Sequence, residues 1–490
     1  MARLSPGMIG QTSIRLRIDD WPNPSVWLRT TVPGRTLAEF ALTSVGPPAR
    51  AGTWSLDIEG LTSGTTYTFD IEGASQPHPV TIRTPPESLE KGPLLLALLS
   101  CYFPSNEYEK NPSQVLGCLT TRSGDRPDEQ VPHLKVFGGD QIYADVPWSW
   151  SSQRATEVYQ SLYREAWTPD RLGRLIACGA NVFVPEDHEF WNSFPDEMPY
   201  LVRSGGTEWF EWATAGAETA WVEQTIWNFG KEFLGGASCR RGWGQTTLAG
   251  VDMFVADTRT DRVSLNGARC YLDTSTMGAH ATSSKRSMMG PDQLKALTDW
   301  VVGVKRLGLL AIGQPLLGPT TGAWTFDTNL ADYETDYDAI LTALRRRIAE
   351  YGVSFIVLTG DIHWGRLVYW SPPTPPTKGS KDAKLVEFVA SPLARVGKMK
   401  SLLSRKNDVG KPASTKLEPA DWQPLRRFLS GFTETCAFAT GENNFGMLSL
   451  SAPSGDRRSA TFELWNPMML TRPLDVWAKN TYCRLESLEL

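Results

Sequence analysis

Five short apolar runs, each ending abruptly at a polar or reactive residue, are the strongest constraint on how this chain folds. They span residues 94–99, 134–137, 181–184, 251–256 and 354–358. Mostly apolar runs of this length are typical of strands that are buried on both faces. Binding and catalytic sites on such sheets gather at strand ends, where the connecting loops converge. The pattern therefore predicts an α/β fold of layered β-sheets flanked by helices, with a site where the strands end.

Residues 1–88 follow a different pattern, which predicts a separate small all-β domain. Polar and apolar side chains alternate over 13–18 and 53–58, and a glycine-containing turn leads into a further alternating segment within 60–69. Alternation with a period of two is the signature of a half-buried strand. Short strands separated by glycine and proline favour a fibronectin-like or immunoglobulin-like sandwich.

A second domain is assigned to residues 89–490, beyond the Thr-Pro-Pro linker at 84–86. Helices are predicted over 208–228 and 292–305, between the apolar runs. No internal repeat is visible. The basic stretch at 378–416 is interpreted as a solvated loop, with a phosphate-attracting lid as the alternative, and the chain from about 395 onward is only weakly assigned.

Composition and charge exclude several classes of protein. Hydrophobic residues make up 41% of the chain and charged residues 21%, as in ordinary soluble globular proteins. The net charge of −5 gives no general attraction to nucleic acid or to an anionic membrane. The N-terminal residues lack the apolar core of a secretion signal, and the seven cysteines have no CxxC spacing. We expect a cytoplasmic protein with reduced thiols and with neither a nucleic-acid nor a membrane partner.

The groups at the five strand ends are those that bind metals. They are Cys101, Asp140 with Tyr143, the cluster at 186–189, Asp257 with Arg259, and Asp361 with His363. Sulfur, oxygen and nitrogen donors that converge from separate strands suit a polynuclear metal site. Residues i and i+2 of an extended chain share a face, so Asp361 and His363 can address one metal.

These blocks resemble a known family. Gly-Asp-Gln-Ile-Tyr at 139–143, Glu-Asp-His-Glu at 186–189 and Gly-Asp-Ile-His at 360–363 are similar to the motifs of calcineurin-like metallophosphoesterases. Further similarities point to the PhoD-like (alkaline phosphatase D) branch: Tyr143, Cys101 after a strand, the segments at 257–259, 290–294 and 313–315, and the preceding β module. The resemblance extends from about residue 10 to about residue 395.

The resemblance implies metal cofactors. A ferric ion is implied at Cys101, Asp140, Tyr143, Asp361 and His363. One or two divalent ions are implied near Asp140 and the block that contains Asp187 and Asn192. Calcium is the first choice for these ions, and zinc, manganese and magnesium are the alternatives. The donor chemistry agrees, because thiolate, phenolate and imidazole suit iron whereas calcium takes oxygen ligands.

The activity implied by the resemblance is hydrolysis of phosphoric monoesters or diesters. A hydroxide bridging two metals would attack phosphorus in line, with Asp140 as the bridging carboxylate. His188, next to the Asp187 carboxylate, would stabilise the transition state or protonate the leaving group. Arg259 would bind the non-bridging oxygens through its planar guanidinium.

Other interpretations of the same residues stay open. Cys101 alone could be a small buried hydrophobe, Asp257 and Arg259 could form a structural ion pair, and His188 could be an ordinary ion-paired histidine. A second hypothesis is a catalytically inactive scaffold that binds a partner through its β module. Three departures from the family pattern stand beside the resemblance: Cys-Tyr-Phe at 101–103 in place of Asp-x-His, Pro-Glu at 185–186 in place of Trp-Asp, and no secretion signal.

Tryptophan is abundant, with 19 in the chain, of which nine lie between residues 148 and 243. Trp148, Trp150 and Trp191 follow proposed ligands at short separations, and Trp209 and Trp212 share one side of a predicted helix. Core packing is the ordinary role of such residues. The alternative is an aromatic wall beside the metals, which predicts a small-molecule phosphate ester with an aromatic leaving group as the substrate.

Overall fold

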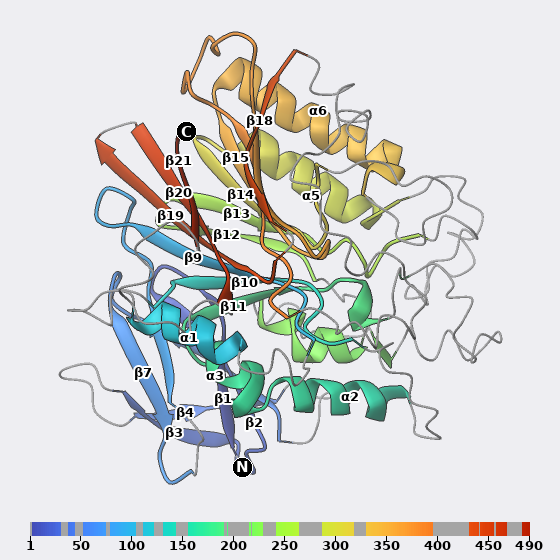
Figure 1. Ribbon diagram of the computed structural model, residues 1–490. Coiled ribbons are helices and arrows are strands. Elements are labelled where there is room, and N and C mark those ends of the chain that lie inside the picture. Colours follow the sequence, from blue (N-terminus) through green and yellow to red (C-terminus); the bar gives the residue numbers. More distant parts are fainter. Residues whose placement is uncertain are drawn as a thin grey trace, which may run out of the picture.

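β-Sheets form the frame of this mixed α/β protein, with helices packed on their outer faces (Figure 1). The computed structural model describes residues 2–30, 38–44, 52–74, 79–103, 111–121, 131–143, 155–190, 194, 215–216, 218–228, 242–263, 287–317, 330–394, 431–440, 442–454, 457–467 and 483–490. Within these ranges no helix has the length and apolar character needed to cross a membrane.

The N-terminal strands form two four-stranded antiparallel sheets, as predicted for residues 1–88. One sheet has the order β1 (Arg3–Ile9), β2 (Ser13–Asp19), β6 (Trp54–Glu59), β5 (Thr43–Ser44). The other has the order β4 (Ala38–Ala41), β3 (Ser25–Thr30), β7 (Thr66–Ile71), β8 (Val80–Arg83). Side chains of β7 are alternately buried and half-buried, which confirms the strand predicted within 60–69. We call this part the β module.

A six-stranded sheet contains three of the predicted buried strands. Its order is β11 (Ala180–Val184), β10 (Leu134–Gly138), β9 (Leu94–Leu99), β19 (Phe445–Ser454), β20 (Arg457–Trp465), β21 (Cys483–Glu489). The first three strands run parallel, and β19 pairs antiparallel with β9. The C-terminal strands, which the sequence pattern did not predict, therefore complete the sheet that carries Cys101 and Asp140 at its strand ends.

A seven-stranded sheet contains the other two predicted strands. Its order is β12 (Gly244–Leu248), β13 (Val251–Val255), β14 (Leu307–Ala311), β15 (Ser354–Thr359), β17 (Leu385–Val389), β16 (Gly365–Ser371), β18 (Thr433–Thr440). The four strands from β13 to β17 are mutually parallel. Their carboxyl ends lie at one edge, so the polar residues that follow β13 and β15 come together with those that follow β9 and β10.

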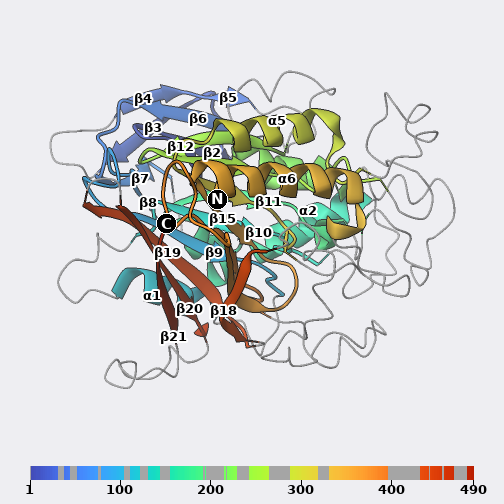
Figure 2. The same ribbon diagram turned by 90° about the horizontal axis from the view of Figure 1, so that it is seen from above.

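The helices lie outside the sheets. They are α1 (Asn111–Thr121), α2 (Ala155–Ala166), α3 (Arg174–Ile176), α5 (Gly290–Gly303) and α6 (Glu334–Tyr351), with shorter turns η2 (Pro169–Gly173), η3 (Asp187–Glu189), η4 (Thr225–Trp227) and η7 (Leu330–Asp332). Helices α5 and α6 lie side by side on the seven-stranded sheet (Figure 2). The helix predicted at 292–305 is confirmed as α5, and residues 218–223 of the one predicted at 208–228 are helical.

Strand β17 corrects the prediction of a solvated loop over 378–416. Residues 385–389 of that stretch are fully buried in the middle of the seven-stranded sheet, and residues 395–416 lie outside the described part of the chain. The charged Glu387 hides this strand from a hydropathy pattern. Its carboxylate pairs with Arg366 on the neighbouring strand β16, so the two buried charges neutralise each other.

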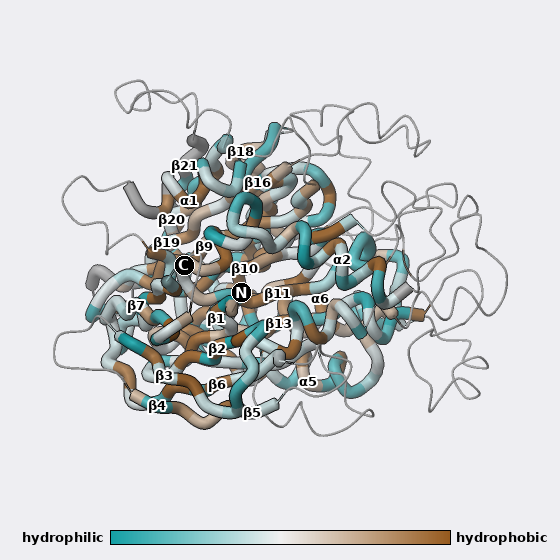
Figure 3. Tube along the Cα trace, turned by 90° about the horizontal axis from the view of Figure 1, so that it is seen from below, coloured by the Kyte–Doolittle hydropathy of each residue, from teal (hydrophilic) through white to brown (hydrophobic). Residues whose placement is uncertain are grey.

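The β module shares its hydrophobic core with the two large sheets. Side chains of β2, β6 and β8 belong to the same buried cluster as those of β10 and β11, and β1 lies against β11. Figure 3 shows hydrophobic stretches along β2 and β6. The linker at 84–86 therefore joins two packed parts rather than two independent ones.

His133, which precedes β10, is a fully buried histidine that must remain neutral. Its Nδ1 accepts a hydrogen bond from the backbone N–H of Leu95 at 2.8 Å, and protonation of this nitrogen would break that bond. Burial, with a smaller effect of Arg83, lowers the pKa of His133 from 6.5 to about 3. The unfolded chain takes up this proton at a higher pH than the folded chain, so acid favours unfolding.

We therefore expect the stability contributed by neutral His133 to be complete above its unfolded pKa of about 6.5 and to be lost as the pH falls toward about 3. At pH 5 the loss is about 2 kcal/mol. Urea unfolding at about pH 5 and pH 7 measures it, with His133→Gln as the comparison, because glutamine can accept the Leu95 bond without titrating. Equal pH dependence in the two proteins would contradict this assignment.

Candidate metal centre

Four of the predicted metal ligands have strained backbone conformations. Six described residues other than glycine have a positive φ, and four of them are predicted ligands: Cys101 (55°), Asp140 (58°), Asp361 (66°) and His363 (52°). The left-handed conformation is unfavourable for residues with a Cβ, and it persists where surrounding contacts fix it. Each of these residues follows a buried strand, so the turn that ends the strand also directs the side chain into the site.

Close packing of the strand ends brings the ligands together. Gly360, after β15, lies against Ser100, after β9; a Cβ at Gly360 would lie 2.2 Å from the Ser100 Cβ. Only glycine permits this approach between the two large sheets. The contact places Asp361 beside Cys101, although 260 residues separate them.

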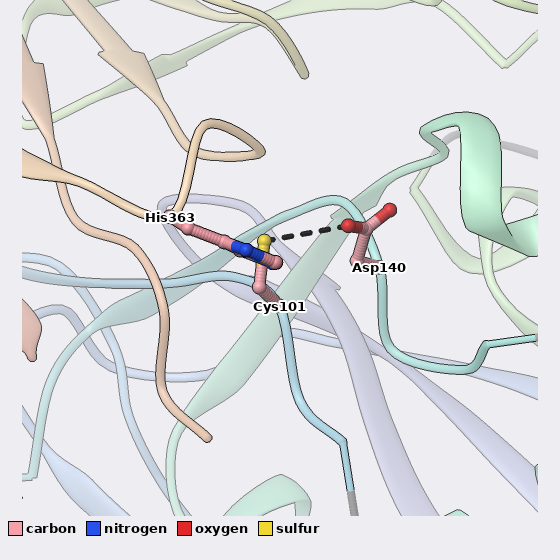
Figure 4. Close-up of side chains that lie close together, drawn as sticks. All are labelled: Cys101, Asp140 and His363. Carbon is pink, nitrogen blue, oxygen red and sulfur yellow. Dashed lines mark hydrogen bonds between the residues drawn. The ribbon is translucent and has the colours of Figure 1, made fainter. Parts of the chain in front are cut away.

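Cys101, Asp140 and His363 form the first cluster (Figure 4). Their ligand atoms lie within 4.8 Å of one another, and the Cys101 Sγ is 3.4 Å from Asp140 Oδ2. The side chains come from three separate loops and point toward one another. The Tyr143 hydroxyl is 3.0 Å from His363 Nε2, so the predicted phenolate donor reaches the same place.

Two further clusters continue from the first. Asp140, Asp187 and His188 form one, and Glu186, Asp187 and Asp361 form the other, each with ligand atoms within 4.8 Å. Asp140 belongs to the first two clusters and Asp187 to the last two. The arrangement is therefore a connected row of donors with more than one place for a cation.

The charges of this site fit bound cations. Burial, together with the nearby Asp187, Asp361 and Glu189 carboxyls, raises the pKa of Asp140 well above its ordinary value, against a lowering effect of His188. Burial, Asp140 and Asp361 likewise raise the pKa of the Cys101 thiol. The Asp140 Oδ1 is buried without a hydrogen-bond partner. Buried like charges and an unpartnered oxygen are unfavourable unless a metal ion compensates them.

The pKa of Tyr143 is also raised well above its ordinary value, by burial first and then by Cys101 and Asp140. A phenolate at this position requires a strongly acidic metal. The Tyr143 ring packs against the His188 ring, with centroids 4.2 Å apart and an interplanar angle of 36°, so the predicted ligand is in contact with the predicted catalytic histidine.

Two serines that the sequence reasoning missed support the Cys101 sulfur. The Ser100 Oγ and the Ser391 Oγ each lie 3.1 Å from Sγ. Ser100 accepts the N–H of Asp361 at 2.8 Å, and Ser391 accepts the N–H of His363 at 3.1 Å. Each serine oxygen accepts a backbone N–H and can donate its hydroxyl proton to the sulfur, where such a bond favours the thiolate. Ser391 follows β17, so its position after a buried strand could have identified it, but β17 itself was not predicted.

Gln314 is a second supporting residue. Its amide nitrogen donates to Asp361 Oδ2 at 3.2 Å, and its amide oxygen accepts from Arg262 at 2.7 Å. It lies in the segment 313–315 that resembles a connecting segment of the family. The structure shows that Gln314 contacts the predicted metal ligand Asp361.

Arg259 contacts the donors through Glu186 and has 1% of its surface exposed. Its guanidinium donates to Glu186 and to the carbonyl of Phe194, the latter at 2.6 Å. Asp257 instead accepts from the backbone N–H groups of Arg259 and Thr260. The ion pair considered for this motif therefore joins Arg259 to Glu186, 73 residues away.

Glu186 stands where the family pattern has an aspartate, and a glycine at position 139 leaves space for its longer side chain. A Cβ at Gly139, which has φ 96°, would lie 2.4 Å from the Glu186 Cβ. Glu186 also begins η3, where it accepts the N–H of Asp187 at 3.1 Å. It is thus both a cap for the turn that carries Asp187 and His188 and a member of the third cluster.

Some predicted residues lie outside the described part of the chain. They are Asn192 and the tryptophans Trp148, Trp150, Trp191, Trp209 and Trp212. Cys101, Asp140, Asp187, His188, Asp361 and His363 lie in the connected row of donors, and Tyr143 contacts that row at His363.

Comparisons with known proteins agree with this geometry. Residues 122–430, more than half of the chain, match the family described as PhoD-like phosphatase. A solved structure of PhoD is similar with a TM-score of 0.63 and 14% identity, over 94% of this chain and 86% of the other. The purple acid phosphatase PPD1 from yellow lupin (Lupinus luteus) seeds has a TM-score of 0.53 and 11% identity, over 100% and 73%. At these identities the two structures show a shared fold. No curated protein matches the chain in sequence.

Proposed function

Since this chain belongs to the PhoD-like phosphatase family and is therefore a metal-dependent phosphoric ester hydrolase, we propose that the row of donors around Asp140 is its catalytic centre. The observation that carries the proposal is the convergence of Cys101, Asp140 and His363 from three strand ends in strained backbone conformations. An inactive scaffold would have no need to maintain buried, mutually repelling donors.

The donor types suggest how the cations are distributed. We assign ferric iron to Cys101, Asp140, Tyr143, Asp361 and His363, because thiolate and phenolate suit a trivalent iron. A divalent ion, calcium by preference, is assigned to Asp140 and Asp187, which offer carboxylate oxygens. Asn192 stays a further proposed ligand of that ion. Such ions withdraw charge from a phosphoryl group and make water more acidic.

His188 is the proposed acid of the reaction. It is half-buried, lies beside Asp187 in the second cluster, and packs against the ring of Tyr143 at a tilt. A histidine held in this way can donate a hydrogen bond to the phosphoryl oxygens or a proton to the leaving alkoxide.

Arg259 has a different proposed role from the one expected of its motif. Its contacts with Glu186 and the Phe194 carbonyl favour a positioning function, in which it neutralises Glu186 and so fixes the turn that carries Asp187 and His188. Asp187 then serves both as a ligand and as the carboxylate next to the catalytic histidine.

The substrate class is a small-molecule phosphate ester, and we extend this proposal to esters with an aromatic leaving group. The tryptophans near the ligands in sequence support it, because flat apolar walls contribute on the order of 0.5–1.5 kcal/mol through stacking. The physiological ester and the preference between monoesters and diesters are not assigned.

The test is metal analysis and phosphatase assay of the same protein, purified without chelator. We expect iron with at least one divalent ion, a visible charge-transfer band, and faster hydrolysis of an aryl phosphate than of glycerol phosphate. A chelator should abolish turnover, and restoring the metals should recover it. A colourless, active protein that contains zinc alone would contradict the iron assignment, and metal-independent turnover would contradict the proposed centre.

A further inference from the structure

We infer that the N-terminal β module helps to position Asp140: Arg17 of β2 fixes the segment 222–224, Gln224 of that segment orients Glu189, and Glu189 fixes the backbone of Asp140. This inference rests on the proposed role of Asp140 as a metal ligand. It assigns the β module a function inside the metal centre, in place of the partner-binding role considered for it.

Glu189 is the residue that holds the strained turn at Asp140. Its Oε2 accepts the N–H of Asp140 at 3.0 Å, and its Oε1 accepts the N–H of Gln141 at 2.6 Å. Its Oε2 also accepts the N–H of Glu186 at 2.8 Å. Two consecutive N–H groups bound to one carboxylate fix the peptide plane that follows Asp140, which the left-handed φ of 58° requires.

Gln224 completes this set from another part of the chain. Its Nε2 donates to Glu189 Oε1 at 3.2 Å and to the Tyr163 hydroxyl at 2.8 Å, and its side chain is fully buried. Both oxygens of Glu189 therefore accept two N–H donors each, and the carboxylate can neither rotate nor move without losing one of them.

Arg17 fixes the segment that carries Gln224. Its Nη1 donates to the carbonyls of Val222 and Glu223 at 3.3 and 3.1 Å, and its Nη2 donates to Glu223 Oε2 at 2.6 Å. The guanidinium lies between the rings of Trp167 and Trp227, at 5.5 and 5.1 Å from their centroids. Three backbone and side-chain contacts and two ring faces leave it one orientation.

Asp19, on the same strand, fixes the orientation of the Arg17 guanidinium. It accepts from Arg17 Nε at 2.8 Å, from Arg3 Nη2 at 2.6 Å and from Thr53 Oγ1 at 3.1 Å. Buried ion networks of this kind contribute little net stability, because desolvation offsets the attraction of the charges. A fixed geometry is the property that such a network can supply, and here it leads to the backbone of a proposed ligand.

The experiment measures Mn²⁺ affinity by calorimetry on metal-free protein, together with the visible spectrum of the Co²⁺-substituted protein, which reports ligand geometry. Gln224→Met keeps the volume of the side chain but loses the donor to Glu189; we expect Mn²⁺ to bind about tenfold more weakly. Glu189→Gln turns a donor toward the N–H of Asp140 or Gln141, and we expect a loss of about 100-fold.

Arg17→Met is compared with Arg15→Met. Arg15 lies two residues earlier on the same face of β2, and its ion pair with Asp57 of β6 lies within the β module. We expect Arg17→Met alone to weaken Mn²⁺ binding severalfold and to alter the Co²⁺ spectrum, while both variants lower the melting temperature.

Unchanged Mn²⁺ affinity and Co²⁺ spectrum in Arg17→Met and Gln224→Met would overturn the inference and leave the proposed metal centre intact. If Arg17→Met does not fold, the Mn²⁺ affinities of Gln224→Met and Glu189→Gln decide whether the inference holds: weaker binding supports it, and unchanged binding overturns it. Failure of the unsubstituted protein to bind either metal would instead overturn the proposed function, and this inference with it.

Discussion

Replacing Cys101 by alanine is expected to lower kcat at least about 100-fold while the protein stays folded. Loss of a residue that hydrogen-bonds a metal ligand typically costs about 10–100-fold in metal affinity or activity, so loss of a ligand should cost more. Cys101 is fully buried, and its sulfur lies in contact with Asp140, the Asp361 carbonyl and the hydroxyls of Ser100 and Ser391. An ordinary apolar cysteine would not be surrounded by polar groups in this way.

The measurements are kcat with an aryl phosphate, iron content and the visible absorption band. Cys178→Ala is the matched control, because Cys178 is also a free, buried cysteine but belongs to the segment before β11, away from the donors. We expect the control to keep its iron, its colour and its kcat. If Cys101→Ala also keeps all three, Cys101 is a packing residue and the iron assignment must be revised.

The residues of the site could be predicted largely because each follows a buried strand. The runs before Cys101 and Asp361 contain no charged residue, and the run before Asp140 contains one, Lys135, so both the strands and their polar ends stand out in the sequence. Ser391 follows β17 in the same way, but Glu387 lies in the middle of that run and the polar, lysine-rich residues 378–384 precede it, and the Glu387 partner Arg366 is identified only once β16 and β17 are paired. A hydropathy pattern considers one strand at a time, so it does not include the partner that neutralises a buried charge on a neighbouring strand.

Contacts between distant segments could not be predicted for a different reason. The sequence placed Arg259 next to Asp257 and suggested a local ion pair, whereas the structure pairs it with Glu186 of another loop. In the same way, nothing near Arg17 in sequence indicates Glu223. Such partners depend on how the sheets pack, and hydrophobic periodicity contains no information about that packing.

Replacing Asp140 by asparagine is expected to have the largest effect on turnover, a loss of kcat on the order of 1,000-fold, because Asp140 belongs to two of the three clusters. Asparagine keeps the size of the side chain and an oxygen acceptor but loses the negative charge with which Asp140 would hold two cations. The measurement is kcat beside the content of iron and of divalent metal, both of which should fall. Loss of one metal alone would mean that Asp140 does not bridge.

The same substitution should stabilise the metal-free protein. Burial and three neighbouring carboxyls raise the pKa of Asp140 well above its unfolded value. The folded chain therefore retains this proton where the unfolded chain has released it, and stability falls as the pH rises above about 4. Asp140→Asn removes that penalty. Thermal unfolding of the chelated protein between about pH 6 and pH 8 should therefore show a higher melting temperature, which corresponds to a gain in the free energy of unfolding on the order of 1 kcal/mol or more. A residue whose removal strengthens the fold and abolishes catalysis is maintained for the metal, whereas a lower melting temperature would identify Asp140 as part of the structural core.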